Sequence, residues 1–77
     1  MMVSYPLGEW TLAFDRAYRV VRDDTTAVVL DEDRTALVLL SLTETGNLRI
    51  ERTYYAMICE IDAAERKAVF HTTEELG

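Results

Sequence analysis

The sequence predicts an all-β fold, and two features of the chain support this prediction. Short runs rich in β-branched and aromatic residues recur along the chain, separated by polar clusters of the kind that form turns. The links between these runs are short, which favours antiparallel neighbours because a parallel pair needs a long crossover connection. We therefore expect one domain over residues 1–77, built as an antiparallel meander of five to six strands in a sheet or a partly open barrel.

The first strand is expected at residues 10–14, after an irregular lead-in over residues 1–8. Pro6 and Gly8 favour a turn in the lead-in. Apolar and polar residues then alternate from Trp10 onward, as in a strand with one buried side. A helical stripe also fits this region, but Gly8 is a poor helix opener and the segments that follow are strand-like, so we favour the strand.

The rest of the chain divides into further strands and turns. Strands are expected at 18–22, 26–30, 35–43, 48–61 and 67–72, with turns at 23–25, 31–34, 44–47 and 62–66 and a frayed tail over 73–77. The alternation changes phase near residues 52–53, which we interpret as a bulge. The alternative is a helix within 48–70, because the apolar positions also fit a helical stripe and residues 62–65 resemble a capping box. The fold class would then be α+β.

The segment 35–43 is apolar on both sides, which is unusual for a strand with one wet face. Leu37 and Leu39 share one side, and Val38, Leu40 and Leu42 share the other. A second apolar side must be covered by barrel closure, by a terminal segment or by a partner chain. These five residues are therefore candidates for a homodimer interface, since small domains often complete their core by association.

The negative charge of the chain is concentrated in one stretch. Acidic residues number 14 against 8 basic ones, which gives a net charge of −6. Residues 23–33 hold five acids and no base: Asp23, Asp24, Asp31, Glu32 and Asp33. This balance argues against direct binding to nucleic acid or to an anionic membrane, both of which need a basic surface. In a meander, Asp23 and Asp24 share one end with residues 44–45, and residues 31–33 share the other with residues 15–16 and 62–66.

The residues that could carry chemistry are few and scattered. His71 is the only histidine, and Cys59 is the only cysteine and lies in an apolar run. Residues 31–33 lack the glycine and the ligand series of a calcium loop, and no glycine-rich phosphate loop is present. We therefore expect no catalytic residues, no metal site and no cofactor, and we expect that the protein is not an enzyme.

The single cysteine also indicates a compartment. It excludes an intramolecular disulfide, whereas secreted domains of this size usually contain several. No apolar run approaches the roughly 20 residues that a membrane helix requires. We expect a cytoplasmic protein.

Three functions are compatible with these features. The first is a protein-binding module that inhibits a nucleic-acid-handling partner by occupying its basic surface through the five acids of 23–33, as phage-type inhibitors, antitoxins and immunity proteins do. The second is an assembly subunit that oligomerises through the apolar side of 35–43. The third is a small β-barrel that binds single-stranded nucleic acid or another ligand through its arginines and tyrosines.

Overall fold

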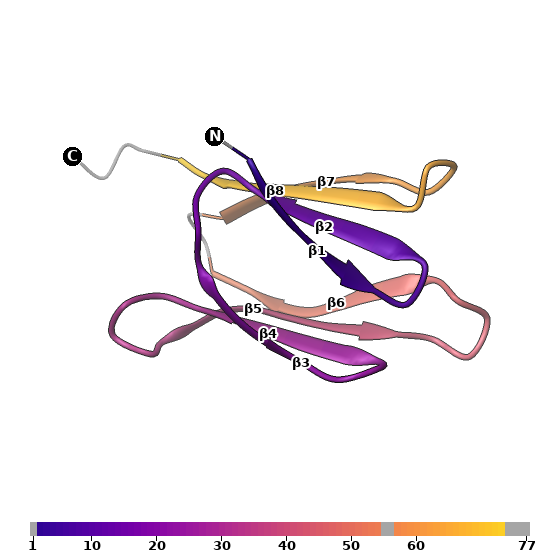
Figure 1. Ribbon diagram of the computed structural model, residues 1–77, viewed down its shortest axis with the longest axis horizontal. Helices are drawn as coiled ribbons and strands as arrows, with labels where there is room; N and C mark the ends of the chain where they lie inside the picture. Colours follow the sequence, from indigo (N-terminus) through magenta and orange to yellow (C-terminus); the bar gives the residue numbers. More distant parts are fainter. Residues whose placement is uncertain (1, 55–56, 74–77) are drawn as a thin grey trace.

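The computed structural model describes residues 2–54 and 57–73, and in these residues it is all-β, as predicted. Eight strands form two four-stranded sheets that lie face to face (Figure 1). The strands are β1 Val3–Leu7, β2 Trp10–Phe14, β3 Arg19–Arg22, β4 Thr26–Leu30, β5 Ala36–Leu42, β6 Leu48–Thr53, β7 Met57–Asp62 and β8 Lys67–Thr72. No helix occurs in the described residues, so the alternative of a helix within 48–70 is wrong.

The two sheets are connected in different ways. One sheet is a meander in the order β3-β4-β5-β6, as predicted, and all its pairs are antiparallel. The other has the order β1-β2-β8-β7 and consists of two hairpins joined by a parallel pairing of β2 with β8. The prediction of one continuous meander is therefore wrong, because the chain leaves the second sheet after β2 and returns to it at β7.

Two segments account for the extra strands. The expected lead-in over residues 1–8 instead contains β1, which pairs with β2 over its whole length. Pro6 is tolerated there because β1 is an edge strand, where a missing N–H breaks no ladder bond. The expected long strand 48–61 is two strands, β6 and β7, which lie in different sheets. The expected tail over 73–77 lies outside the described residues, apart from Thr73.

The core lies between the sheets. Phe14 on β2 stacks on Phe70 of β8 at a ring-centroid distance of 5.0 Å, and the rings of Tyr5 and Tyr18 meet Phe14 edge to face. Offset and edge-to-face ring contacts of this kind add to the stabilisation from apolar burial. The fully packed cluster consists of Leu7, Leu12, Phe14, Ala27, Val29, Leu37, Val38, Leu40, Met57, Ala68 and Phe70.

A bulge explains why β5 is apolar on both sides. Val38 lies opposite Val29 and Ala36 lies opposite Leu30, so Leu37 is an extra residue on β5. Leu37, Val38 and Leu40 are all buried in the core of the chain itself. The second sheet therefore covers the residues for which we expected a partner chain. Leu42 is half-buried and packs against the core, and Leu39 is half-buried on the outer face.

The two ends of the sandwich differ in what they contain (Figure 1). We call one the hairpin end, because the turns 8–9, 23–25, 43–47 and 63–66 meet there. Trp10 donates from Nε1 to the Gly46 carbonyl at 2.8 Å, Arg66 Nη1 lies 2.7 Å from Glu9 Oε1, and the Leu42 amide donates to the Thr25 carbonyl.

We call the other the crossover end. It contains the link 15–18 between the sheets, the turn 31–35 and the end of β6. Asp23–Asp24 and Asp31–Asp33 thus lie at opposite ends, as expected. Residues 62–66 lie at the hairpin end and not beside residues 15–16, because the break between β6 and β7 adds one reversal of the chain.

Candidate functional site

Acidic side chains gather at the hairpin end. Its four turns carry five carboxylates, from Glu9, Asp23, Asp24, Glu44 and Glu65, and one basic residue, Arg66. Arg66 is already paired with Glu9 at 2.7 Å. All five acidic residues are exposed. Arg22, Asp62 and Lys67 directly flank these turns and are also exposed, so the hairpin end has six carboxylates against three basic side chains and is negatively charged.

Asp23 has a structural role in this surface. Its Oδ1 accepts hydrogen bonds from the amides of Thr25 and Thr26, at 2.9 and 2.8 Å, and from the Thr26 hydroxyl at 2.9 Å. These bonds, with that from Thr25 first, lower the pKa of Asp23 below its ordinary value. Asp23 is thus a charged turn cap whose Oδ1 is occupied within the chain.

Three other carboxylates at this end are available to a partner. The side chains of Asp24, Glu44 and Glu65 form no hydrogen bond or ion pair with any described residue. They come from three different turns, so the folded chain brings together charges that are far apart in sequence.

The acidic turn 31–33 has different surroundings at the crossover end. Asp31 accepts hydrogen bonds from the amides of Asp33 and Thr35, at 2.8 and 2.9 Å, and caps the β4–β5 turn. A groove of about 620 Å³ lies beside this turn. Its lining consists of Arg16, Ala17, Tyr18, Arg19, Leu30, Asp31, Glu32, Asp33 and Arg34. Three arginines balance three acids in this groove, so it has mixed charge. The structure does not bring the five predicted partner-binding acids together.

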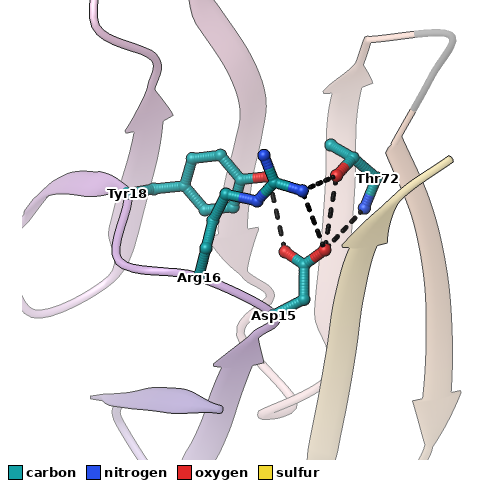
Figure 2. A network of polar contacts seen from close by, with 4 residues as sticks. All are labelled: Asp15, Arg16, Tyr18 and Thr72. Carbon is teal, nitrogen blue, oxygen red and sulfur yellow. Dashed lines mark hydrogen bonds and ion pairs between the residues drawn. The ribbon is translucent and has the colours of Figure 1, made fainter. Parts of the chain in front are cut away.

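At the crossover end, a side-chain network joins the link 15–18, which connects the two sheets, to the end of β8 (Figure 2). Asp15 Oδ2 accepts from the amide and the hydroxyl of Thr72, at 3.2 and 3.3 Å, and Asp15 Oδ1 accepts from the Tyr18 hydroxyl at 3.4 Å. Arg16 donates to the Thr72 hydroxyl at 2.9 Å and lies 3.6 Å from Asp15 Oδ2. Burial is the largest cause of a raised pKa for Tyr18. The network holds the start of the crossover against the end of β8.

Tyr18 lines the groove at the crossover end together with three arginines, and Arg16 lies 5.9 Å from the centre of its ring, but three acidic residues line the same groove. Tyr5 and Tyr18 pack against the core, and Trp10 is buried. Arg22 lies 6.0 Å from the centre of the Tyr5 ring, whereas Arg16 and Arg19 line the groove at the crossover end. Stacking of single-stranded bases needs exposed aromatic faces beside a basic track, so this arrangement gives the third function little support.

Cys59 and His71 lie on opposite faces of their sheet. Cys59 pairs with Phe70 and packs against the core, whereas His71 pairs with Ile58, which has the opposite facing. Burial raises the pKa of Cys59 to about 11, with a further contribution from the charge of Glu60, so the thiol is neutral at ordinary pH. His71 Nε2 lies 3.9 Å from Glu60 Oε2. The two residues cannot act as a thiolate–imidazole pair in this fold.

Residues 2–54 and 57–73 contain neither a cluster of metal-ligating side chains nor a membrane-spanning helix. No group of three or more His, Cys, Asp or Glu side chains is placed so that it could hold a metal ion. No helix in this part of the chain could cross a membrane.

Comparison of the chain with protein-family models, with curated proteins and with solved structures finds no match. The candidate site therefore depends on the geometry of this chain alone. Sequence reasoning placed Asp23 and Asp24 at one end together with residues 44–45, which the structure bears out, but it missed Glu9 and Glu65 as their neighbours. Each of these acids lies in a turn, which is a signal visible in the sequence. Placing the turn 63–66 at the hairpin end, however, required the correct direction of β7 and β8.

Proposed function

We propose that this protein is a binding module for a basic protein partner, which it engages through the hairpin end. The observation that supports this proposal is the convergence of five carboxylates on four turns whose only basic residue is already paired. Asp24, Glu44 and Glu65 are the residues that contact the partner in this proposal, and Asp23 fixes the turn that carries Asp24. Asp31, Glu32 and Asp33 have a smaller part, because arginines share their groove.

Electrostatics explains how such a surface would work. Carboxylates on tight turns lose little conformational freedom on binding, and a field of one sign speeds the encounter with an oppositely charged partner. Basic surfaces are typical of proteins that handle nucleic acid. Carboxylates that occupy such a surface compete with phosphates, so the protein would act as an inhibitor of its partner. The single cysteine favours the cytoplasm as the place where it acts.

The test compares two variants that remove the same charge at different ends. Asp24→Asn/Glu44→Gln alters the hairpin end, and Glu32→Gln/Asp33→Asn alters the crossover end. The probe is an oligolysine peptide, with binding measured by fluorescence anisotropy at low and high salt. We expect the hairpin-end variant to bind about tenfold more weakly and the crossover-end variant to change little, since each exposed charge pair contributes up to about 1 kcal/mol.

Two outcomes would contradict the proposal. Equal losses in both variants would mean that only net charge matters, and an affinity independent of salt would mean that the interface is not electrostatic.

A second candidate function, an assembly subunit that forms homodimers, has one supporting observation. Val21, Val28 and Leu39 lie side by side across β3, β4 and β5 on the outer face, and Val21 is 54% exposed. Sedimentation equilibrium distinguishes the two functions, because the partner-binding module is expected to be monomeric at high concentration.

A further inference from the structure

The two sheets leave four edge strands, and three of them carry features that discourage pairing with another chain. β1 contains Pro6, which lacks an N–H. β3 is only four residues long and begins and ends with arginine. β6 carries a bulge at Glu51, because Leu39 pairs with Arg52 while Leu40 pairs with Ile50. Short length, charge, proline and bulges are the usual means by which natural proteins protect sheet edges.

The fourth edge, β7, is longer than β3 and has no proline and no bulge, and its charges are the two acids Glu60 and Asp62. β7 (Met57–Asp62) pairs with β8 at six consecutive positions without a register shift, and it contains no proline and no basic residue. Ile58 and Ile61 are 41% and 48% exposed and lie on opposite faces of the strand. An edge strand of this kind offers unpaired backbone groups along one side and apolar contacts on both faces to an added strand.

The charges of β7 indicate which strand would be added. Glu60 and Asp62 are exposed on the outer face, together with Ile58. Antiparallel pairing of two copies about Glu60 would place Glu60 against Glu60, and pairing about Ile61 would place Glu60 against Asp62. Like charges directly opposite one another destabilise a strand pair. A second copy of this chain is therefore a poor occupant in these two registers.

A basic strand meets the same positions favourably. Lysine or arginine at alternate positions would face Glu60 and Asp62, and the apolar residues between them would lie beside Cys59 and Ile61 on the inner face of β7. A depression of about 500 Å³ beside β7 is lined by Glu60, Ile61, Asp62, Ala63, Lys67 and Val69. The depression contains Lys67, which is paired with Asp62 across the strands, so the strongest attraction for an added cation is at Glu60, whose Oε2 lies 3.9 Å from His71 Nε2.

We propose that β7 is a docking strand that binds an extended segment of a protein partner in which lysine or arginine alternates with apolar residues. This inference rests on the proposed function, because it takes the partner to be basic, and it adds the mode of recognition. β7 leads directly into the turn 63–66 of the hairpin end, so a segment along β7 continues onto that acidic surface.

The test uses the full chain and a capped peptide of alternating lysine and valine. Binding is followed by chemical-shift changes and amide exchange in NMR spectra. We expect slowed exchange confined to β7 and β8, and about tenfold weaker binding for Glu60→Lys. Glu32→Lys makes the same charge change away from β7 and should have little effect. Unchanged urea midpoints show that both variants are folded.

A modified peptide separates strand addition from charge attraction. Methylation of the backbone nitrogens that would face β7 keeps every charge but removes the hydrogen-bond donors, and we expect it to abolish binding. Equal binding of the methylated peptide, or equal losses for Glu60→Lys and Glu32→Lys, would overturn the docking strand. Dimerisation of the unaltered protein through β7 would overturn it as well.

The two proposals fail in different ways. If Asp24→Asn/Glu44→Gln weakens peptide binding and the changes at β7 do not, the docking strand is wrong and the proposed function stands. If methylation and Glu60→Lys abolish binding and the hairpin-end variant does not, β7 is the binding surface and the hairpin end is not.

Discussion

The hairpin end and the crossover end of the sandwich are closed by different interactions. At the hairpin end each turn is short and joins neighbouring strands, so local backbone bonds such as Gly46 to Thr43 complete it. At the crossover end the chain passes from one sheet to the other. The Asp15 amide donates to the Phe70 carbonyl at 3.1 Å, and the Asp15 side chain binds Thr72 across a separation of 57 positions. The hairpin end is thus left free to present charge, while the crossover end uses its charge within the chain.

The largest expected effect on the free energy of unfolding comes from a pair of variants that compares the two ends. Asp15→Ala removes the acceptor for the Thr72 amide, the Thr72 hydroxyl and the Tyr18 hydroxyl, and should lower the free energy of unfolding by about 2 kcal/mol. The matched change at the hairpin end, Glu9→Gln, removes the exposed ion pair with Arg66 and should cost less than about 1 kcal/mol. Urea denaturation measures both. A larger loss for Glu9→Gln would reverse the comparison.

The same contrast explains what could be predicted from the sequence. β3, β4 and β5 were expected close to their observed bounds, because alternation and short polar turns are local signals. The switch of sheets after Phe14 and after Tyr54 is not local. It depends on which apolar faces meet across the core, and the sequence does not show this. Residues 48–61 therefore resemble one strand whose apolar–polar alternation changes phase.

The candidate site was recovered only in part for the same reason. The charge of Asp23 and Asp24 is visible in the sequence, and their shared end with Glu44 follows from the predicted meander, but their shared end with Glu65 depends on the direction of β7. For Leu37, Val38 and Leu40, the sequence shows that the side chains are buried but not which element covers them. Their apolar character was read correctly, but the cover came from the other half of the chain and not from a partner.

A smaller effect is expected from the two turns in which arginine has a positive φ. Arg34 (φ 67°) closes the β4–β5 turn at the crossover end, and Arg66 (φ 53°) closes the β7–β8 turn at the hairpin end. Glycine adopts this conformation without steric cost, so Arg34→Gly should raise the free energy of unfolding by about 0.5 kcal/mol. Arg66→Gly also loses the pair with Glu9, which offsets the gain, and should be nearly neutral.

Thermal or urea unfolding of both glycine variants checks this difference. A gain for Arg66→Gly equal to that for Arg34→Gly would mean that the ion pair with Glu9 contributes nothing to stability.

The smallest expected effect is a difference in how pH acts on the two ends. At the crossover end the folded-state pKa of Tyr18 is raised above 10.0, mainly by burial. The unfolded chain therefore ionises first, so stability is fully present below pH 10.0 and is lost as pH rises through the folded pKa. Tyr18→Phe should flatten this loss. The pKa of Cys59 is also raised, to about 11, so its ionisation lowers stability over the same alkaline range. Tyr18→Phe is therefore best compared with the unaltered tyrosine in a Cys59→Ala background.

At the hairpin end the sign is reversed. Hydrogen bonds from Thr25 and Thr26 lower the folded-state pKa of Asp23 below 3.8, so the stability they provide is present above that pH and is lost as pH falls through the folded pKa. Asp23→Asn does not titrate and should remove this acid dependence while it leaves the alkaline one unchanged. Exchange of the Thr26 amide, measured across both pH ranges, reports on this turn directly. If the Thr26 amide exchange keeps the same acid dependence in Asp23→Asn, other carboxylates cause that dependence. Ionised Asp23 would then not be what stabilises the 23–25 turn.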